Sequence, residues 1–117
     1  MLLAALAAAC ANEVVRQPTA LTPAVQGAEQ RELEIAQDTE VRVSANYNRI
    51  LPGGSRWRYV GQVAQGAVYR RADGVFTVEG AHVHEAYLVV AGQELVGFYL
   101  PVEKSFSPTT PVVLKTR

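Results

Sequence analysis

The chain contains 117 residues with a mass of 12.7 kDa, and its 11 basic and 11 acidic side chains give a formal net charge of zero. This length fits one domain and leaves no room for a second core. With 49% hydrophobic and 19% charged residues, the chain is too apolar for a disordered protein and too evenly charged for a nucleic-acid-binding protein. We therefore expect no nucleic-acid partner. The one cysteine excludes an internal disulfide framework and a zinc site built from several thiolates.

The chain opens with the apolar sequence MLLAALAAACANE, in which small residues directly precede Cys10. A short apolar run that ends in small residues is typical of the hydrophobic region and cleavage site of a secretory signal peptide. Residues 6–10 (LAAAC) resemble the lipobox of bacterial lipoproteins, although Ala7 stands where leucine is usual and no basic residue precedes the run. The resemblance implies cleavage before Cys10 and a membrane anchor of acyl chains on its sulfur.

Further implications of this resemblance concern location. In lipoproteins an aspartate after the cysteine retains the protein in the inner membrane, and Ala11 at that place implies the outer membrane, with the domain facing the periplasm. The missing basic segment implies a translation start upstream of Met1. Residues 1–9 are thus expected to be signal peptide. Residues 10–30 follow no regular period and contain prolines, which predicts a lipidated cysteine and a flexible linker that spans about 25 Å.

The rest of the chain, residues 31–117, is expected to form a single domain because its apolar residues follow the period of two that strands require. Strands are predicted at residues 33–35, 41–48, 56–63, 67–70, 75–78, 83–91, 94–100 and 112–114. Asp73-Gly74 predicts a tight hairpin between residues 69–71 and 75–78. Gly92-Gln93 predicts a second hairpin, and Pro108 and Pro111 predict a loop. The sequence therefore predicts an all-β fold, a small antiparallel barrel or two-sheet sandwich of about seven strands.

Six arginines and no acidic residue lie between Glu40 and Asp73. If four or more of these arginines share a face, they attract phosphates or carboxylates, and an adjacent tryptophan supplies stacking. The candidate ligand-binding residues are Arg42, Arg49, Arg56, Trp57, Arg58, Arg70 and Arg71. The alternative is that the arginines form the solvated face of a sheet and are neutralised by acids of the neighbouring strands.

His82-Val83-His84-Glu85 is the one cluster in the sequence with metal-ligand chemistry. On a strand His82 and His84 share a face, but a catalytic zinc usually needs three protein ligands. The two histidines are therefore a weak candidate pair, and we expect neither a metal nor another cofactor. The alternative is that both lie at the solvated rim of a strand. Glu85 falls on an otherwise apolar face, where we expect it to pair with an arginine.

The sequence contains no nucleophile motif such as G-x-S-x-G, so we expect no enzymatic activity. Residues 54–57 (GSRW), 84–90 (HEAYLVV) and 97–101 (GFYLP) resemble segments of uncharacterised proteobacterial envelope lipoproteins, which implies no activity. The function we favour is a non-catalytic binding or scaffold module for another envelope or secretion-assembly protein. The alternative is a binding domain that uses the arginines to hold an anionic envelope ligand, namely lipid, lipopolysaccharide or peptidoglycan. Metal sequestration by the two histidines is a third candidate.

Overall fold

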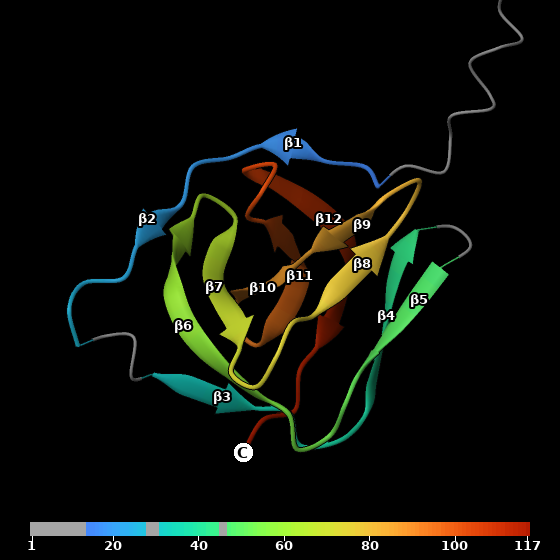
Figure 1. Cartoon of the computed structure of the whole chain (residues 1–117). Helices are drawn as coiled ribbons and strands as arrows, with labels where there is room; N and C mark the ends of the chain where they lie inside the picture. The colour runs from blue at the N-terminus through green and yellow to red at the C-terminus, as the bar shows by residue number, and fades with distance from the viewer. Residues whose placement is uncertain (1–13, 28–30, 45–46) are drawn as a thin grey trace, which may run out of the picture.

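The computed structural model describes residues 14–27, 31–44 and 47–117, and within these ranges it is an all-β protein, as predicted (Figure 1). Cys10 and the predicted signal peptide lie outside the described residues. None of the described residues forms a helix of the length and apolarity that crossing a membrane requires. The strands of the described part are β1 (Gln17–Pro18), β2 (Thr22–Pro23), β3 (Glu32–Glu34), β4 (Thr39–Ser44), β5 (Tyr47–Leu51), β6 (Arg56–Val63), β7 (Gly66–Arg71), β8 (Thr77–Glu79), β9 (Val83–Glu85), β10 (Tyr87–Ala91), β11 (Glu94–Leu100) and β12 (Ser105–Val113).

An antiparallel sheet with the order β1-β12-β11-β10-β7-β6-β2 forms the body of the molecule, and β3 also pairs with β6. The pairs β6–β7 and β10–β11 are consecutive hairpins, and β7 pairs with β10 across them. The ladders shift register within β6–β7, β10–β11 and β11–β12. Such irregularities bend a strand and increase its twist. The sheet is accordingly strongly curled, in agreement with the predicted barrel or sandwich.

Residues 17–23, which we call the strap, connect the two ends of this strand order. At one end of the strap β1 pairs with β12, and at the other β2 pairs with β6. In a flat sheet β1 and β2 lie six strand spacings apart, which is about 29 Å. The four residue steps from Pro18 to Thr22 reach at most about 14 Å. The sheet must therefore curl until its two edges approach each other, and the strap closes the gap (Figure 1).

The strap overturns part of the predicted linker. The sequence predicted a flexible segment over residues 10–30, but residues 17–23 run along the sheet and contribute two strands. The Thr19 amide donates to the Lys104 carbonyl oxygen (3.1 Å), and Val14 is only 3% exposed. The absence of a regular period misled the prediction because two-residue strands are too short to show one.

Apolar side chains gather in two clusters. The larger one includes Trp57, Phe76 and Phe98, and the hairpins β4–β5 and β8–β9 contribute to it. The smaller one contains Tyr99 and Phe106, and Leu21 of the strap packs against it. Because successive residues of a strand point to opposite faces, β7, β10 and β11 supply side chains to both clusters. The curled sheet therefore lies between a large core and a small one.

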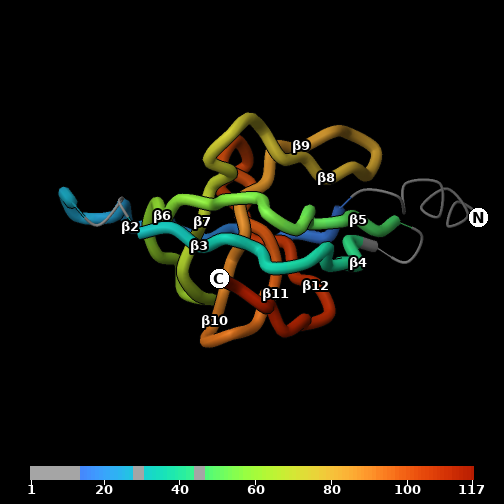
Figure 2. The backbone as a smooth tube through the Cα atoms, turned by 90° about the horizontal axis from the view of Figure 1, so that it is seen from below, coloured from blue at the N-terminus to red at the C-terminus, as the bar shows by residue number. Residues whose placement is uncertain are grey.

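Two hairpins accompany the main sheet. Hairpin β4–β5 lies at one side of the molecule, beside β12. Hairpin β8–β9 lies in front of β10 and β11 in Figure 1, and on the side opposite the β10–β11 turn in Figure 2. These hairpins correct three predictions. Residues 41–48 are not one strand, since β4 and β5 turn back on each other. Residues 83–91 divide at Ala86, whose amide donates to the Phe76 carbonyl oxygen (2.9 Å).

The third correction concerns Asp73-Gly74, where no hairpin forms. Strand β7 pairs with β6 and β10, and β8 pairs with β9. The partners that are distant in sequence prevail because the intervening turn carries Phe76 into the large core. The loop predicted at Pro108 and Pro111 is also wrong, since both prolines lie within β12. Beyond its short contact with β1, β12 is an edge strand, where a missing amide donor is tolerated.

Candidate functional site

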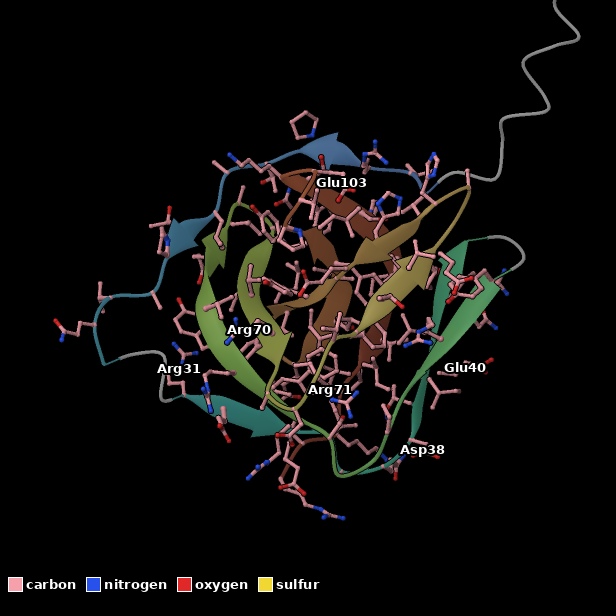
Figure 3. The ribbon with its side chains drawn as sticks, in the orientation of Figure 1. Arg31, Asp38, Glu40, Arg70, Arg71 and Glu103 are labelled. Carbon is pink, nitrogen blue, oxygen red and sulfur yellow. The ribbon has the colours of Figure 1, made fainter. Side chains whose placement is uncertain are left out.

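The predicted arginines do not converge on one face. Strand β6 alternates exposed and buried residues, so Arg56 and Arg58 point away from the large core that contains Trp57. Arg70 is the ladder partner of Arg58 and shares its face. Its neighbour Arg71 is the ladder partner of Trp57 and faces the core. Figure 3 shows Arg70 on the β6 side of the molecule and Arg71 nearer its centre.

The outward arginines have acidic neighbours, as the alternative explanation of the pattern supposed. The Arg58 guanidinium lies 3.3 Å from a Glu32 carboxylate oxygen, and that of Arg56 lies 3.9 Å from Asp73. Glu34, the ladder partner of Arg56, pairs with Arg117 at 3.1 Å. Exposed pairs of this kind contribute about 0–1 kcal/mol each. This face is therefore a solvated surface of mixed charge and not a basic patch.

Arg49 and Arg71 instead lie against the aromatic part of the large core. The Cζ atom of Arg49 is 4.4 Å from the centroid of Phe76, and that of Arg71 is 5.7 Å from the centroid of Trp57. The two rings are themselves in edge-to-face contact at 5.4 Å. Both rings are buried, so Trp57 contacts Arg71 from within the core and offers no exposed face to a ligand. Two strands distant in sequence thus place two guanidinium groups over one aromatic pair, which we call the arginine–aromatic cluster.

The hydrogen bonding of this cluster is incomplete. Within the described part of the chain, the Nε atoms of Arg49 and Arg71 are buried and have no hydrogen-bond partner. A cation–π contact contributes about 0.5–2 kcal/mol. A buried donor left without an acceptor costs about 1–3 kcal/mol. The gain from the cation–π contact and the cost of the unpaired Nε are of similar size. These guanidinium groups therefore add little to the stability of the fold. Each of the two guanidinium groups has one buried N–H donor, the Nε, without an acceptor among the described residues.

Arg42 lies apart from both groups. Its side chain is exposed on β4, and its carbonyl oxygen accepts a hydrogen bond from the Thr109 hydroxyl of β12. Arg31, which the sequence analysis did not select, packs its guanidinium 4.2 Å from the Tyr59 ring and donates to the Tyr69 hydroxyl (3.2 Å). Arg31 lies outside the acid-free segment that drew attention to the others, so only the pairing of β3 with β6 brings it near these tyrosines.

The two histidines differ in environment. His82 is exposed and lies before β9, whereas the His84 side chain is 4% exposed, which corrects the idea of two rim histidines. Their ring centroids are 6.4 Å apart, with the rings nearly perpendicular. His84 Nδ1 lies 2.7 Å from a carboxylate oxygen of Glu103, a contact that the sequence analysis did not foresee. Among the described residues no group of three or more His, Cys, Asp and Glu side chains is placed to hold a metal ion.

Glu85 does not show the arginine partner that the sequence predicted. It is half-buried opposite Thr77 in the β8–β9 ladder, and no ion pair to an arginine forms within the described ranges. The carboxylate that is paired in this region is Glu103, on the turn between β11 and β12. One oxygen of Glu103 contacts His84, and the other is buried without a hydrogen-bond partner. The contact is part of the packing of β9 against this turn.

A cleft of about 440 Å³ opens at the end of the sheet where β10 turns into β11. It is lined by Leu33, Tyr69, Val90, Gly92, Gln93, Val113, Leu114, Lys115 and Thr116. Lys115 is the one charged residue in this lining. Its other polar side chains are those of Tyr69, Gln93 and Thr116, and none of them is a second charged group that would select an anion. It is a less specific candidate than the arginine–aromatic cluster.

Comparison with known proteins adds no assignment. No protein-family model, curated protein or solved structure matches this chain. The arginine–aromatic cluster is therefore judged on its own chemistry.

Proposed function

We propose that the protein is a non-catalytic binding module of the bacterial envelope, anchored in the outer membrane by acyl chains on Cys10 and facing the periplasm. The anchor is supported by the lipobox-like sequence at residues 6–10. The ligand we favour is anionic and belongs to the envelope, such as a lipid, lipopolysaccharide or peptidoglycan. This was the alternative function in the sequence analysis, and the arginine–aromatic cluster is the reason for preferring it.

A single observation carries this choice: Arg49 and Arg71 both have a buried Nε without a hydrogen-bond partner in the described part of the chain. Planar guanidinium groups bind phosphate or carboxylate in a bidentate manner, and their contact with aromatic rings holds their orientation. An anion that accepts from either guanidinium group would supply an acceptor where the fold leaves its Nε without one. The same arginines contribute little to stability, which favours a role in binding over a role in packing.

A scaffold for an envelope or secretion-assembly protein is the second proposal. Strand addition to the main sheet is limited because the strap pairs with parts of both edge strands. The observation that favours a protein partner is hairpin β4–β5, in which β5 pairs only with β4 among the described strands and carries the exposed Ile50. An extended peptide adds most readily to such an edge. Photo-crosslinking from position 50 in intact cells tests this proposal, and a partner protein trapped there supports it.

Binding of anions is testable through Trp57, the only tryptophan of the chain, because Arg71 lies over its ring. The purified protein is titrated with inorganic phosphate and with acetate while the tryptophan emission is recorded. We expect a saturable change that weakens as the salt concentration rises. Lipid A and a soluble peptidoglycan fragment then distinguish the phosphate and carboxylate sources.

Substitutions at three arginines identify the site. Loss of a hydrogen bond to a charged group costs about 1.5–3 kcal/mol, so Arg49→Gln and Arg71→Gln should each weaken binding about tenfold or more. Arg70→Gln is the matched control, since it removes a neighbouring arginine from the opposite face of β7. Equal affinity in all three variants and the wild type would refute the site. The anchor is tested separately by intact mass from a bacterial membrane fraction, where acyl chains should be present in the wild type and absent in Cys10→Ala.

A further inference from the structure

The distance from the proposed anchor to the folded domain is short. Val14 belongs to the large core and is 3% exposed. Cys10 precedes it by four residues, and four residue steps reach at most about 14 Å. The predicted linker of about 25 Å would hold the domain clear of the lipid headgroups. With the chain packed from Val14 onward, acyl chains on Cys10 instead bring one end of the domain to the membrane surface.

That end is built from three chain segments that bond to one another. The segment that begins at Val14 continues into the strap, where Gln17 and Pro18 pair with the start of β12. The turn between β11 and β12 ends at Lys104, whose carbonyl oxygen accepts from the Thr19 amide. The same turn binds β9 through the contact between Glu103 and His84. Figure 3 shows Glu103 next to β1, at the edge of the molecule along which the strap runs.

Each of the three segments exposes a valine. Val15 is 73% exposed, Val83 is 64% exposed and Val102, on the turn between β11 and β12, is 77% exposed. We propose that these three valines form a membrane-docking surface, and that the lipid bilayer in which Cys10 is anchored is its partner. This proposal rests on the acylation of Cys10 in the proposed function. Because the anchor holds the domain at the bilayer, even modest apolar insertion is enough to orient it.

The charges at this end fit an interface with anionic lipid only in part, so apolar contact is the main attraction. Lys104, beside Val102, is an exposed cation that favours anionic headgroups. The carboxylate of Glu103 on the same turn is partly buried and held against His84. Glu79, the ladder partner of Val83, is an exposed carboxylate that opposes the attraction.

The test compares tryptophan reporters at the two ends of the domain. Val102→Trp places a reporter in the proposed surface. Val113→Trp is the matched control, because Val113 is 57% exposed at the far end of β12, about 25 Å away along the strand. Cys10 is the only cysteine, so each full-length variant is coupled through it to maleimide-bearing lipid in phosphatidylglycerol vesicles. Both variants share residues 1–9, whose contribution therefore cancels in the comparison.

Brominated acyl chains quench a tryptophan that enters the headgroup boundary. We expect the emission of Val102→Trp to fall by about half and that of Val113→Trp to match the wild type, whose Trp57 is buried. Equal quenching at both positions, or none at position 102, would overturn the docking surface. The chemical coupling does not depend on natural acylation, so an unmodified Cys10 in the intact-mass experiment would overturn the proposed anchor without affecting this comparison.

Discussion

The closure of the sheet by the strap rests on a glycine, and Gly61→Ala tests it. Gly61 of β6 is the ladder partner of Pro23 in β2. A Cβ at this position would overlap the carbonyl oxygen of Thr22 and would lie 3.0 Å from Cδ1 of Leu21 and 3.1 Å from Cα of Pro23. All three atoms belong to the strap. The Thr22 oxygen and the Pro23 Cα are backbone atoms. A side-chain rotation therefore cannot relieve the overlap, and the strap backbone itself must move.

The size of the effect follows from what the strap can lose. Overpacking a closed site costs about 1–3 kcal/mol. The strap relieves the clash if β2 leaves β6, at the cost of about two backbone hydrogen bonds and the half-burial of Leu21, roughly 1 kcal/mol each. The loss is therefore limited to about 3 kcal/mol. For a domain of about 100 residues a loss of this size lowers the Tm by roughly 12–24 °C.

Urea and thermal unfolding measure this loss, and trypsin reports where it occurs. Detachment of the strap should accelerate cleavage after Arg16 or Arg31, which flank it in the sequence. Gly92→Ala is the control, because Gly92 has a positive φ of 64° but no atom within 4 Å of an added Cβ. It should lose only about 1 kcal/mol and keep the strap protected. If Gly61→Ala is as stable and as resistant to trypsin as Gly92→Ala, the strap does not close the sheet.

Two further predictions concern titratable groups. Glu103→Gln should lower the free energy of unfolding by about 1–3 kcal/mol, because it weakens the contact with the buried His84. His82→Ala, at the exposed ring, should leave the free energy of unfolding unchanged. Urea denaturation that finds the two variants equally stable would contradict a stabilising role for the Glu103–His84 contact. Burial, and secondarily the charge of Tyr87, raises the pKa of Tyr99 above its ordinary value of 10.0. The unfolded state then loses this proton at lower pH than the folded state, so the stability that depends on it is complete below pH 10 and falls as the pH rises further. Tyr99→Phe should flatten this alkaline fall in the free energy of unfolding, and an unchanged slope would rule out Tyr99 as its source.

The sequence predicted best the strands whose limits are local. Residues 56–63 were expected as one strand and form β6, while 94–100 form β11. Residues 56–63 alternate between polar and apolar and residues 94–100 are nearly continuously apolar, and a glycine turn or a proline bounds them. The turn at Gly92, with its positive φ, also lies where the composition placed it. In such segments local patterning and tertiary pairing favour the same structure, so a prediction from sequence succeeds.

The elements that failed are those that depend on distant partners. Nothing near residues 17–23 indicates that they pair with both ends of the sheet, since those partners lie about 40 and 90 residues away. Asp73-Gly74 is a sound local hairpin signal, but Phe76 next to it becomes a buried neighbour of Trp57 and Phe98. The burial of that ring outweighs the preference of two turn residues, because a fully buried phenylalanine side chain contributes about 1.5–3 kcal/mol.

The candidate site shows the same division. Once the strands are known, alternation along β6 and β7 places Arg56, Arg58 and Arg70 on one face of the sheet and Arg71 on the other. The order of charges along the sequence could not make this distinction, so the sequence analysis grouped all four as candidate ligand-binding residues. The acids that accompany the outward arginines come from β3 and from the turn after β7. The aromatic partner of Arg49 comes from a segment that the sequence placed in a hairpin strand. Charge order along a chain therefore indicates that arginines are abundant, and only the fold decides which of them lack a partner.

The strap joins folding to position at the membrane. It begins three residues after Val14, the first described residue that follows the proposed anchor, so the contacts that hold β1 and Val14 also set how far Cys10 lies from the core. While Val14 is buried, that separation is at most about 14 Å, whereas a released segment from Cys10 to β3 behaves as a coil with a span of about 25 Å. An anchored domain with a closed strap is thus held with one end at the bilayer, and one with an open strap is free to reorient. The clash at Gly61 is relieved when β2 leaves β6, which leaves β1 paired with β12 and Val14 in the large core. Gly61→Ala should therefore weaken the fold and leave the docking of Val102 in place.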